Sequence, residues 1–298
     1  MADVERVRIG FVGAGRLGTA LAWSIAQRGM RVAAAADAVA ANAERLAAPI
    51  PGCVVTTMQE VIDTCDLVFV TTPDGLIEAT TAQGRWRSGM YAVHCSGVTD
   101  VSALESAEVA GAVVGGFHPM QTFGDPAAAA RSLPGCTITI EAQEPLNGIL
   151  VGIAQRLDCR VNRLPPGMRG RYHAAAGYTS QFINALFREA SKIWQSWGAS
   201  EEDAVRALLP LARGTLESID SVGICKGMPG PVSRGDVASI KKHVTALQPL
   251  GEETMEFYRL LCDRTIPLAL ECGAIDAATA QRFRETLAES KPERKVAT

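Results

Sequence analysis

The segment that most constrains the fold of this chain is the glycine-rich run Gly13-Ala14-Gly15-Arg16-Leu17-Gly18. A β-branched and aromatic run, Val7–Val12, precedes it, and a helical pattern that begins at Leu17 follows it. Gly13 permits a tight turn, Gly15 leaves room for an anion next to the backbone, and Gly18 lets helix and strand pack closely. Because free amides and a helix dipole favour a pyrophosphate, we expect residues 13–18 to bind a dinucleotide. A purely structural glycine turn is the alternative.

An acidic residue, Asp37, closes the second expected strand, nineteen residues after Gly18. A carboxylate at this point suits the two ribose hydroxyls of NAD, whereas it repels the 2′-phosphate of NADP. The five residues that follow include no Arg or Lys, and we expect Arg45 to lie one helical turn too far to bind that phosphate. Asp37 therefore predicts NAD rather than NADP as the cofactor. A helix N-cap is the compatible structural interpretation.

Composition limits the class of protein. The chain has 298 residues, enough for one large or two ordinary domains, and a hydrophobic content of 47% suffices for a core. A net charge of −3 gives no reason to expect nucleic acid or an anionic membrane as a partner. The first residues do not resemble a signal peptide, no apolar run approaches the length of a membrane span, and the eight cysteines include no C-x-x-C pair. We expect a cytoplasmic protein with reduced, mostly buried thiols.

Short apolar runs alternate with helical patterns in the first half of the chain, which favours a largely parallel sheet buried on both faces. The expected strands are Val7–Val12, Arg31–Ala36, Cys53–Thr56, Leu67–Val70, Tyr91–Cys95, Ala112–Phe117, Thr137–Glu141 and Arg160–Arg163. After residues 164–167 the patterns are almost all helical, with one long helix over about 169–197, and Pro210 is expected to kink or end another. We predict an α/β fold with a Rossmann-type, mostly parallel sheet in a dinucleotide-binding domain (1–165), followed by an all-α substrate and dimerisation domain (166–298).

Two of the four histidines stand out as possible acid–base groups. His118 follows an expected strand and precedes Pro119, which holds its backbone extended at the rim of the sheet that faces the cofactor. His173 shares one helical face with Gly177 and Gln181. Such a polar stripe is either exposed to solvent or crosses the active-site cleft.

Other polar groups follow the expected strands or lie in the loop before a late helix. Thr71, Thr72 and Pro73 come after the fourth strand, where they would cover the cofactor. The Ser96 hydroxyl, after the fifth strand, would bind a substrate carbonyl or carboxylate, or belong to an ordinary Ser-Gly turn. Arg234 either clamps a substrate carboxylate or is a surface arginine. The sequence contains no metal-ligand spacing, so no metal is expected.

Four motifs together resemble a known family. They are Gly13–Gly18, Gly116-Phe117-His118-Pro119-Met120-Gln121-Thr122-Phe123, Tyr172-His173-Ala174-Ala175 and Gly230-Pro231-Val232-Ser233-Arg234-Gly235-Asp236. The chain resembles the bacterial Rossmann-like oxidoreductases that carry a C-terminal helical domain of unknown function. That family is similar in plan to pyrroline-5-carboxylate reductase, ketopantoate reductase and the β-hydroxyacid dehydrogenases. The resemblance implies a nucleotide domain, a helical domain that makes a homodimer, and an active site between them.

The resemblance also implies site residues, and this chain departs from the pattern at three of them. His173 stands near the position where the β-hydroxyacid relatives have a catalytic lysine. Gln181 stands where an asparagine is expected. After the second expected strand, where relatives often have a Ser-Arg pair suited to NADP, this chain has Ala36 and Asp37. We expect the substrate to be bound by a set of six residues: Ser96, His118, Met120, Gln121, Gln181 and Arg234.

These observations predict an NAD(H)-dependent oxidoreductase. It would transfer a hydride between nicotinamide and a small carboxylate-bearing hydroxy acid or ketone, with His173 as the first proton-donor candidate, His118 as the second, and Ser96 assisting. An imine- or amino-acid-directed enzyme is one alternative, and a non-catalytic NAD(H)-binding protein is another.

Overall fold

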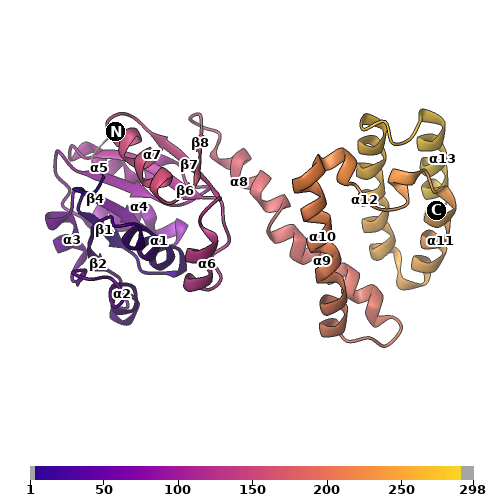
Figure 1. Ribbon diagram of the computed structural model, residues 1–298, viewed down its shortest axis with the longest axis horizontal. Coiled ribbons are helices and arrows are strands. Elements are labelled where there is room, and N and C mark those ends of the chain that lie inside the picture. Colours follow the sequence, from indigo (N-terminus) through magenta and orange to yellow (C-terminus); the bar gives the residue numbers. More distant parts are fainter. Residues whose placement is uncertain (1–3, 290–298) are drawn as a thin grey trace, which may run out of the picture. The chain divides into compact units, whose positions relative to one another are not determined.

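The computed structural model describes residues 4–289, which form two compact units (Figure 1). The first unit ends at Ser180 and the second begins at Gln181. The sequence placed the domain boundary at 165/166, but α8, Arg169–Tyr178, belongs to the first unit. The side chain of Arg169 explains this difference, because it is buried and bonded to a strand of the sheet. Among the described residues, no helix combines the length and the apolar character that crossing a bilayer requires.

An eight-stranded sheet with the order β3-β2-β1-β4-β5-β6-β7-β8 forms the centre of the first unit. The strands are β1 Ile9–Val12, β2 Val32–Ala36, β3 Val54–Val55, β4 Leu67–Val70, β5 Tyr91–His94, β6 Val113–Pro119, β7 Thr137–Ala142 and β8 Arg160–Arg163. All neighbouring strands pair in parallel except β6 and β7. The strand order reverses between β1 and β4, as in dinucleotide-binding sheets. The expected Rossmann-type, mostly parallel sheet is therefore confirmed.

Helices cover both faces of this sheet (Figure 1). Those on the first face are α1 Arg16–Gln27, α2 Ala40–Ala47 and α7 Leu146–Arg156, and α6 Pro126–Ser132 packs on α1. Those on the second face are α3 Met58–Thr64, α4 Ile77–Gln83 and α5 Glu105–Val109, with the 3-10 turns η1 Asp74–Leu76 and η2 Val101–Leu104 between elements. Phe11 and Phe69 stack at 5.3 Å in the first core. Residues of β4 alternate between the two cores, which is why the whole strand is buried.

The second unit is helical in its described part, which confirms the expected all-α region. Its elements are α9 Gln181–Gln195, α10 Glu201–Gly227, η3 Val232–Arg234, α11 Val237–Leu247, η4 Gln248–Leu250, α12 Glu252–Glu271 and α13 Ala277–Ala288. The core of this unit gathers buried side chains of α11, α12 and α13, among them Ile240, Ile266 and Phe283.

Two helix boundaries differ from the sequence-based expectation. The long helix expected over 169–197 is broken between α8 and α9, because Thr179 and Ser180 both donate their hydroxyls to the carbonyl oxygen of Ala176. Pro210 removes one backbone hydrogen bond but does not end α10. The non-helical residue in that helix is Gly223, with φ 80° and ψ 172°. Glycine adopts a positive φ without a steric penalty, so the helix breaks there.

The cysteines also differ in part from expectation. Cys225 and Cys272 form a disulfide in the second unit, with their Cα atoms 5.2 Å apart. The sequence predicted reduced thiols throughout, and a pair 47 residues apart carries no local signal that could have revealed it. The other six cysteines are free thiols.

Candidate active site

Strands β1, β4 and β5 end at a common edge of the sheet, which we call the carboxyl edge, and β6 runs past this edge to Pro119. Pairing across β1, β4, β5 and β6 aligns Val12, Val70, His94 and Gly116 in one row. The loops that follow β1, β4 and β5 therefore leave the sheet together, beside the last residues of β6. Ligands of open α/β sheets bind at such an edge, next to the point where the strand order reverses. The glycine run, Thr71–Pro73, Ser96 and His118 all belong to these loops or strand ends.

The glycine run has the geometry of an anion-binding turn. Gly13 has φ +98°, and a Cβ there would lie 2.7 Å from the backbone of Thr71. A Cβ on Gly18 would lie 2.6 Å from the carbonyl oxygen of Gly13, so helix and turn are in contact. Gly15, in contrast, is the N-cap of α1, no side chain caps the helix there, and a Cβ on it would meet nothing within 4 Å. The residues present therefore fit a pyrophosphate at the start of α1.

Asp37 is held in place by backbone and side-chain donors. Its Oδ2 accepts a hydrogen bond from the amide of Ala14 at 2.6 Å, and its Oδ1 accepts from the amide of Val39 at 2.8 Å and from Asn42 Nδ2 at 3.1 Å. Burial alone would raise the pKa of this carboxyl, but these hydrogen bonds outweigh it and lower the pKa. Asp37 thus carries its negative charge directly beside the glycine turn.

Arg45 lies closer to this turn than the sequence suggested. Its Nη2 donates to the carbonyl oxygen of Ala14 at 3.3 Å and to Asn42 Oδ1 at 3.1 Å. Arg45 therefore reaches both the glycine turn and Asn42, and whether it lies too far to bind a 2′-phosphate stays a prediction. The long arginine side chain extends past one turn of α2 to make these contacts.

The residues after β4 support the turn from the other side. Thr71 Oγ1 donates to the carbonyl oxygen of Gly13 at 2.5 Å, so this hydroxyl holds the glycine turn. Thr72 Oγ1 is buried and has no hydrogen-bond partner among the described residues. Pro73 precedes η1. A buried hydroxyl that lacks a partner at this edge is consistent with a polar ligand there.

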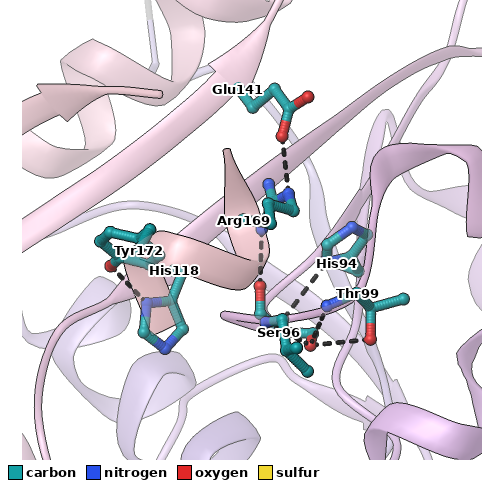
Figure 2. A network of polar contacts seen from close by, with 8 residues as sticks. His94, Ser96, Thr99, His118, Glu141, Arg169 and Tyr172 are labelled. Atoms are coloured by element: carbon teal, nitrogen blue, oxygen red, sulfur yellow. Dashed lines mark hydrogen bonds and ion pairs between the residues drawn. The ribbon is translucent and has the colours of Figure 1, made fainter. Parts of the chain in front are cut away.

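His118 and His173 come together at the end of β6 (Figure 2 shows His118). Their ring centroids are 6.3 Å apart, and a Cβ on Gly97 would lie 2.7 Å from His173 Cδ2 and 2.8 Å from His118 Nε2. The hydroxyl of Tyr172 shares a hydrogen bond with His118 Nδ1 at 2.6 Å. Gly97 is needed here because any side chain would fill the space between the two imidazoles.

Burial shifts the pKa values of His118 and Tyr172. Burial lowers the pKa of His118 to about 4, and the nearby charges of His173 and Arg169 act in the same direction. Burial raises the pKa of Tyr172. His118 is therefore a neutral imidazole at pH 7, hydrogen-bonded to a protonated phenol.

The sequence analysis missed a buried arginine that connects the loops (Figure 2). Arg169 is 1% exposed, and its Nε donates to Glu141 Oε2 at 2.6 Å while its Nη1 donates to the carbonyl oxygen of Ser96 at 2.8 Å. Gly116 lies between His94 and Glu141 across the sheet, and a Cβ on it would be 1.9 Å from Arg169 Nη2. The glycine in mid-strand was the available signal, because it marks a close approach of another group.

Ser96 is engaged by its own turn. Its Oγ accepts from the amides of Val98 at 3.3 Å and Thr99 at 3.0 Å, and it donates to Thr99 Oγ1 at 2.9 Å. This is the arrangement of the Ser-Gly turn that was the alternative interpretation. The neighbouring His94 is fully buried, and burial lowers its pKa to about 3.

The remaining predicted substrate residues are distributed over both units. Met120 is 39% exposed, and Gln121 Nε2 donates to the carbonyl oxygen of Ser132, the last residue of α6, at 3.1 Å. Gln181 opens α9 and Arg234 ends η3, both in the second unit, so their part in the site stays a prediction. Asp236 caps α11 by accepting a hydrogen bond from the amide of Ser239.

Comparisons with known proteins agree with this architecture. A Rossmann-like domain matches residues 2–119, and a domain of unknown function, DUF2520, matches residues 136–265. The chain therefore combines a Rossmann-like domain with a DUF2520 domain. No curated protein matches it.

Several solved structures share the fold. A Bacteroides fragilis protein provisionally named an NADP oxidoreductase has a TM-score of 0.67 and 24% identity, over 89% of this chain and 99% of that one. A reductive aminase from Aspergillus terreus, solved with NADPH, has a TM-score of 0.56 and 16% identity, over 95% of this chain and 93% of that one. A pyrroline carboxylate reductase from Plasmodium falciparum, solved with NADP, has a TM-score of 0.58 and 13% identity, over 97% of this chain and 100% of that one. At these identities the likeness shows a common fold.

Proposed function

We propose that the protein is an oxidoreductase that uses a nicotinamide dinucleotide. The observation that carries the proposal is the convergence, at the carboxyl edge, of a glycine turn that opens onto α1 and a cluster of His118, His173 and Tyr172. The first group suits a pyrophosphate, and the second suits proton transfer to a substrate heteroatom. The names of the solved structures with the same fold support the same class of reaction.

Within this proposal the bound cofactor supplies or accepts the hydride, and the chain positions it and moves the proton. The amides at the start of α1 bind the diphosphate, while Asp37 orients the adenosine ribose. His173 is the first candidate for proton donor. His118 is a poor cationic acid because its pKa is about 4, but its neutral ring can pass a proton between the Tyr172 hydroxyl and the substrate.

We propose that the choice between NAD and NADP is set by two opposing groups. The Asp37 carboxylate repels a 2′-phosphate, whereas the Arg45 guanidinium, bonded to Asn42 beside it, attracts one. The solved structures named with NADP or NADPH favour NADP, so the preference for NAD that Asp37 predicts receives no support from them.

For the substrate, we propose a small carboxylate-bearing hydroxy acid or ketone. The second candidate is reduction of an imine or oxidation of an amino acid, favoured by the reductive aminase and pyrroline carboxylate reductase names among the similar structures. The third candidate is a non-catalytic dinucleotide-binding protein.

A substrate panel distinguishes these candidates. Purified protein is mixed with NAD or NADP and a series of hydroxy acids and amino acids, and reduced nicotinamide is followed by absorbance. Turnover of hydroxy acids that falls strongly in His173→Ala supports the first candidate. Turnover of amino acids alone favours the second. Tight dinucleotide binding without any turnover favours the third.

We also propose that the second unit forms a homodimer through α10. Only Ala204 and Gly227 are buried in this long helix, and the core of the unit takes no side chain from it. Its exposed apolar side chains are Leu209, Leu211, Leu216, Ile219, Val222 and Ile224. A second copy presents the same apolar side chains, so pairing about a two-fold axis would remove part of this surface from water in both copies.

Sedimentation analysis tests the dimer. Leu216→Glu should give monomers, while Glu217→Gln, the next residue on the same helix, should leave the dimer intact. A wild-type protein that is monomeric at about 100 μM would contradict the proposal.

A further inference from the structure

A cavity of about 650 Å³ lies in the first unit. Its walls include the first residues of β6 and the last residues of β7 and β8, together with residues of η2 and α5. Most of this lining lies at the start of β6, whereas His118 lies near the end of that strand. The part of the lining nearest to the candidate active site includes Glu141, which pairs with Gly116. The volume is within the usual range of small-molecule sites, about 300–1,000 Å³.

The lining of this cavity is acidic over an apolar floor. Glu108, Glu141 and Glu144 contribute three carboxylates, and one cation, Arg163, lies among the lining residues. The Glu141 carboxylate is also paired with the buried Arg169. Val101 and Val114 add hydrocarbon surface. Glu144 is held by Asn147 Nδ2 at 2.7 Å and by the amide of Gly148 at 3.0 Å, which lower the pKa of its carboxyl. The site is therefore preorganised as an anion at neutral pH. We propose that this cavity binds a small aliphatic ammonium compound, with the ammonium among the carboxylates and the hydrocarbon chain on the apolar floor.

The cavity has a direct connection to the candidate active site. Glu141 lines the cavity and also accepts the hydrogen bond of Arg169 Nε at 2.6 Å. Arg169 Nη1 holds the carbonyl oxygen of Ser96, and its Nη2 has no hydrogen-bond partner among the described residues. An ammonium group beside Glu141 competes with Arg169 for the carboxylate. Occupancy of the cavity therefore loosens the 95–100 loop through the path Glu141, Arg169 and Ser96.

Calorimetric titration of the full-length protein, without dinucleotide, tests the site. The probe is putrescine, and the controls of the same chain length are succinate, with the opposite charge, and butanediol, without charge. Putrescine should bind and the two controls should not. Glu108→Gln should weaken putrescine binding about fivefold, while Arg163→Gln should strengthen it by a similar factor. Glu105→Gln is the matched control, because it changes the same charge on α5 at a residue outside the cavity lining.

The result that overturns the site is absence of putrescine binding, equal binding of butanediol, or an equal loss in Glu105→Gln and Glu108→Gln. The link to the active site is tested separately by hydrogen exchange of residues 95–100, which saturating putrescine should accelerate. Unchanged exchange in the bound protein refutes the link. Neither measurement requires a nicotinamide cofactor or turnover, so failure here is distinct from failure of the proposed oxidoreductase function.

Discussion

The contact between Gly116 and Arg169 provides a quantitative test of how the site is built. In Gly116→Ala the new methyl carbon would lie 1.9 Å from Arg169 Nη2, whereas ordinary contacts begin at 3.4 Å. The guanidinium must therefore retreat by about 1.5 Å. A shift of that size breaks its hydrogen bonds to Glu141 at 2.6 Å and to the Ser96 carbonyl at 2.8 Å. Hydrogen bonds to charged groups contribute about 1.5–3 kcal/mol each, so we expect a loss of about 3 kcal/mol in the free energy of unfolding.

Urea unfolding of the full-length protein measures this loss. Replacing Trp194 and Trp197 with Phe removes the tryptophans of the second unit, so that fluorescence reports the first unit. Gly170→Ala is the matched control, because a Cβ there meets nothing within 4 Å and the helix should tolerate it. In an Arg169→Met background the Gly116→Ala substitution should cost less than about 0.5 kcal/mol. The reasoning would be refuted if Gly116→Ala lowered the free energy of unfolding equally with Arg169 and with Met at position 169. It would also be refuted if Gly116→Ala caused no loss when Arg169 is present.

Three further predictions follow from the same structure. Asp37→Ser should raise the ratio of NADP to NAD affinity and Arg45→Ala should lower it, as measured by fluorescence titration; equal ratios in all three proteins would contradict the assigned selectivity. Burial lowers the pKa of His118 to about 4 and that of His94 to about 3 from 6.5, so protons bind the unfolded chain more strongly. The free energy of unfolding should therefore be highest above pH 6.5 and should fall as the pH is lowered toward 4. The fall should be less steep in His118→Gln, and an identical pH dependence of the wild type and this variant would argue against the reasoning. Cys225→Ser should destabilise the second unit by about 2–4 kcal/mol in thermal unfolding, and an unchanged transition would be inconsistent with the disulfide.

The sheet could be predicted because its strands are local signals. Runs such as Leu67–Val70 are short, apolar and β-branched, and the structure reproduces that strand residue for residue. The glycine turn is equally local, since Gly13, Gly15 and Gly18 each have a separate steric role that spacing alone specifies.

The polar site could be predicted only in part, because its contacts depend on strand register and on packing. The sequence singled out His118 and His173, and the structure brings them together. It gave no reason to connect Arg169 with Glu141 and Ser96, since the three lie on different elements and meet only once β6 aligns Gly116 between its neighbours.

Helix boundaries and the disulfide were predicted less well for a related reason. The break after α8 depends on hydroxyls that compete for the carbonyl oxygen of Ala176, and the sequence pattern around it remains helical. The pairing of Cys225 with Cys272 requires the arrangement of two distant helix ends, which residue spacing does not encode.

The central claim is that the turn at the start of α1 binds a nicotinamide dinucleotide, and calorimetric titration with NADH and NADPH tests it most directly. The wild-type protein should bind at least one of them well below about 1 mM, and Gly15→Val should abolish binding. That variant should keep its unfolding transition, because a side chain at Gly15 meets no protein atom within 4 Å at its Cβ. Absence of binding of both dinucleotides to the wild type, or equal binding to Gly15→Val, would contradict the claim.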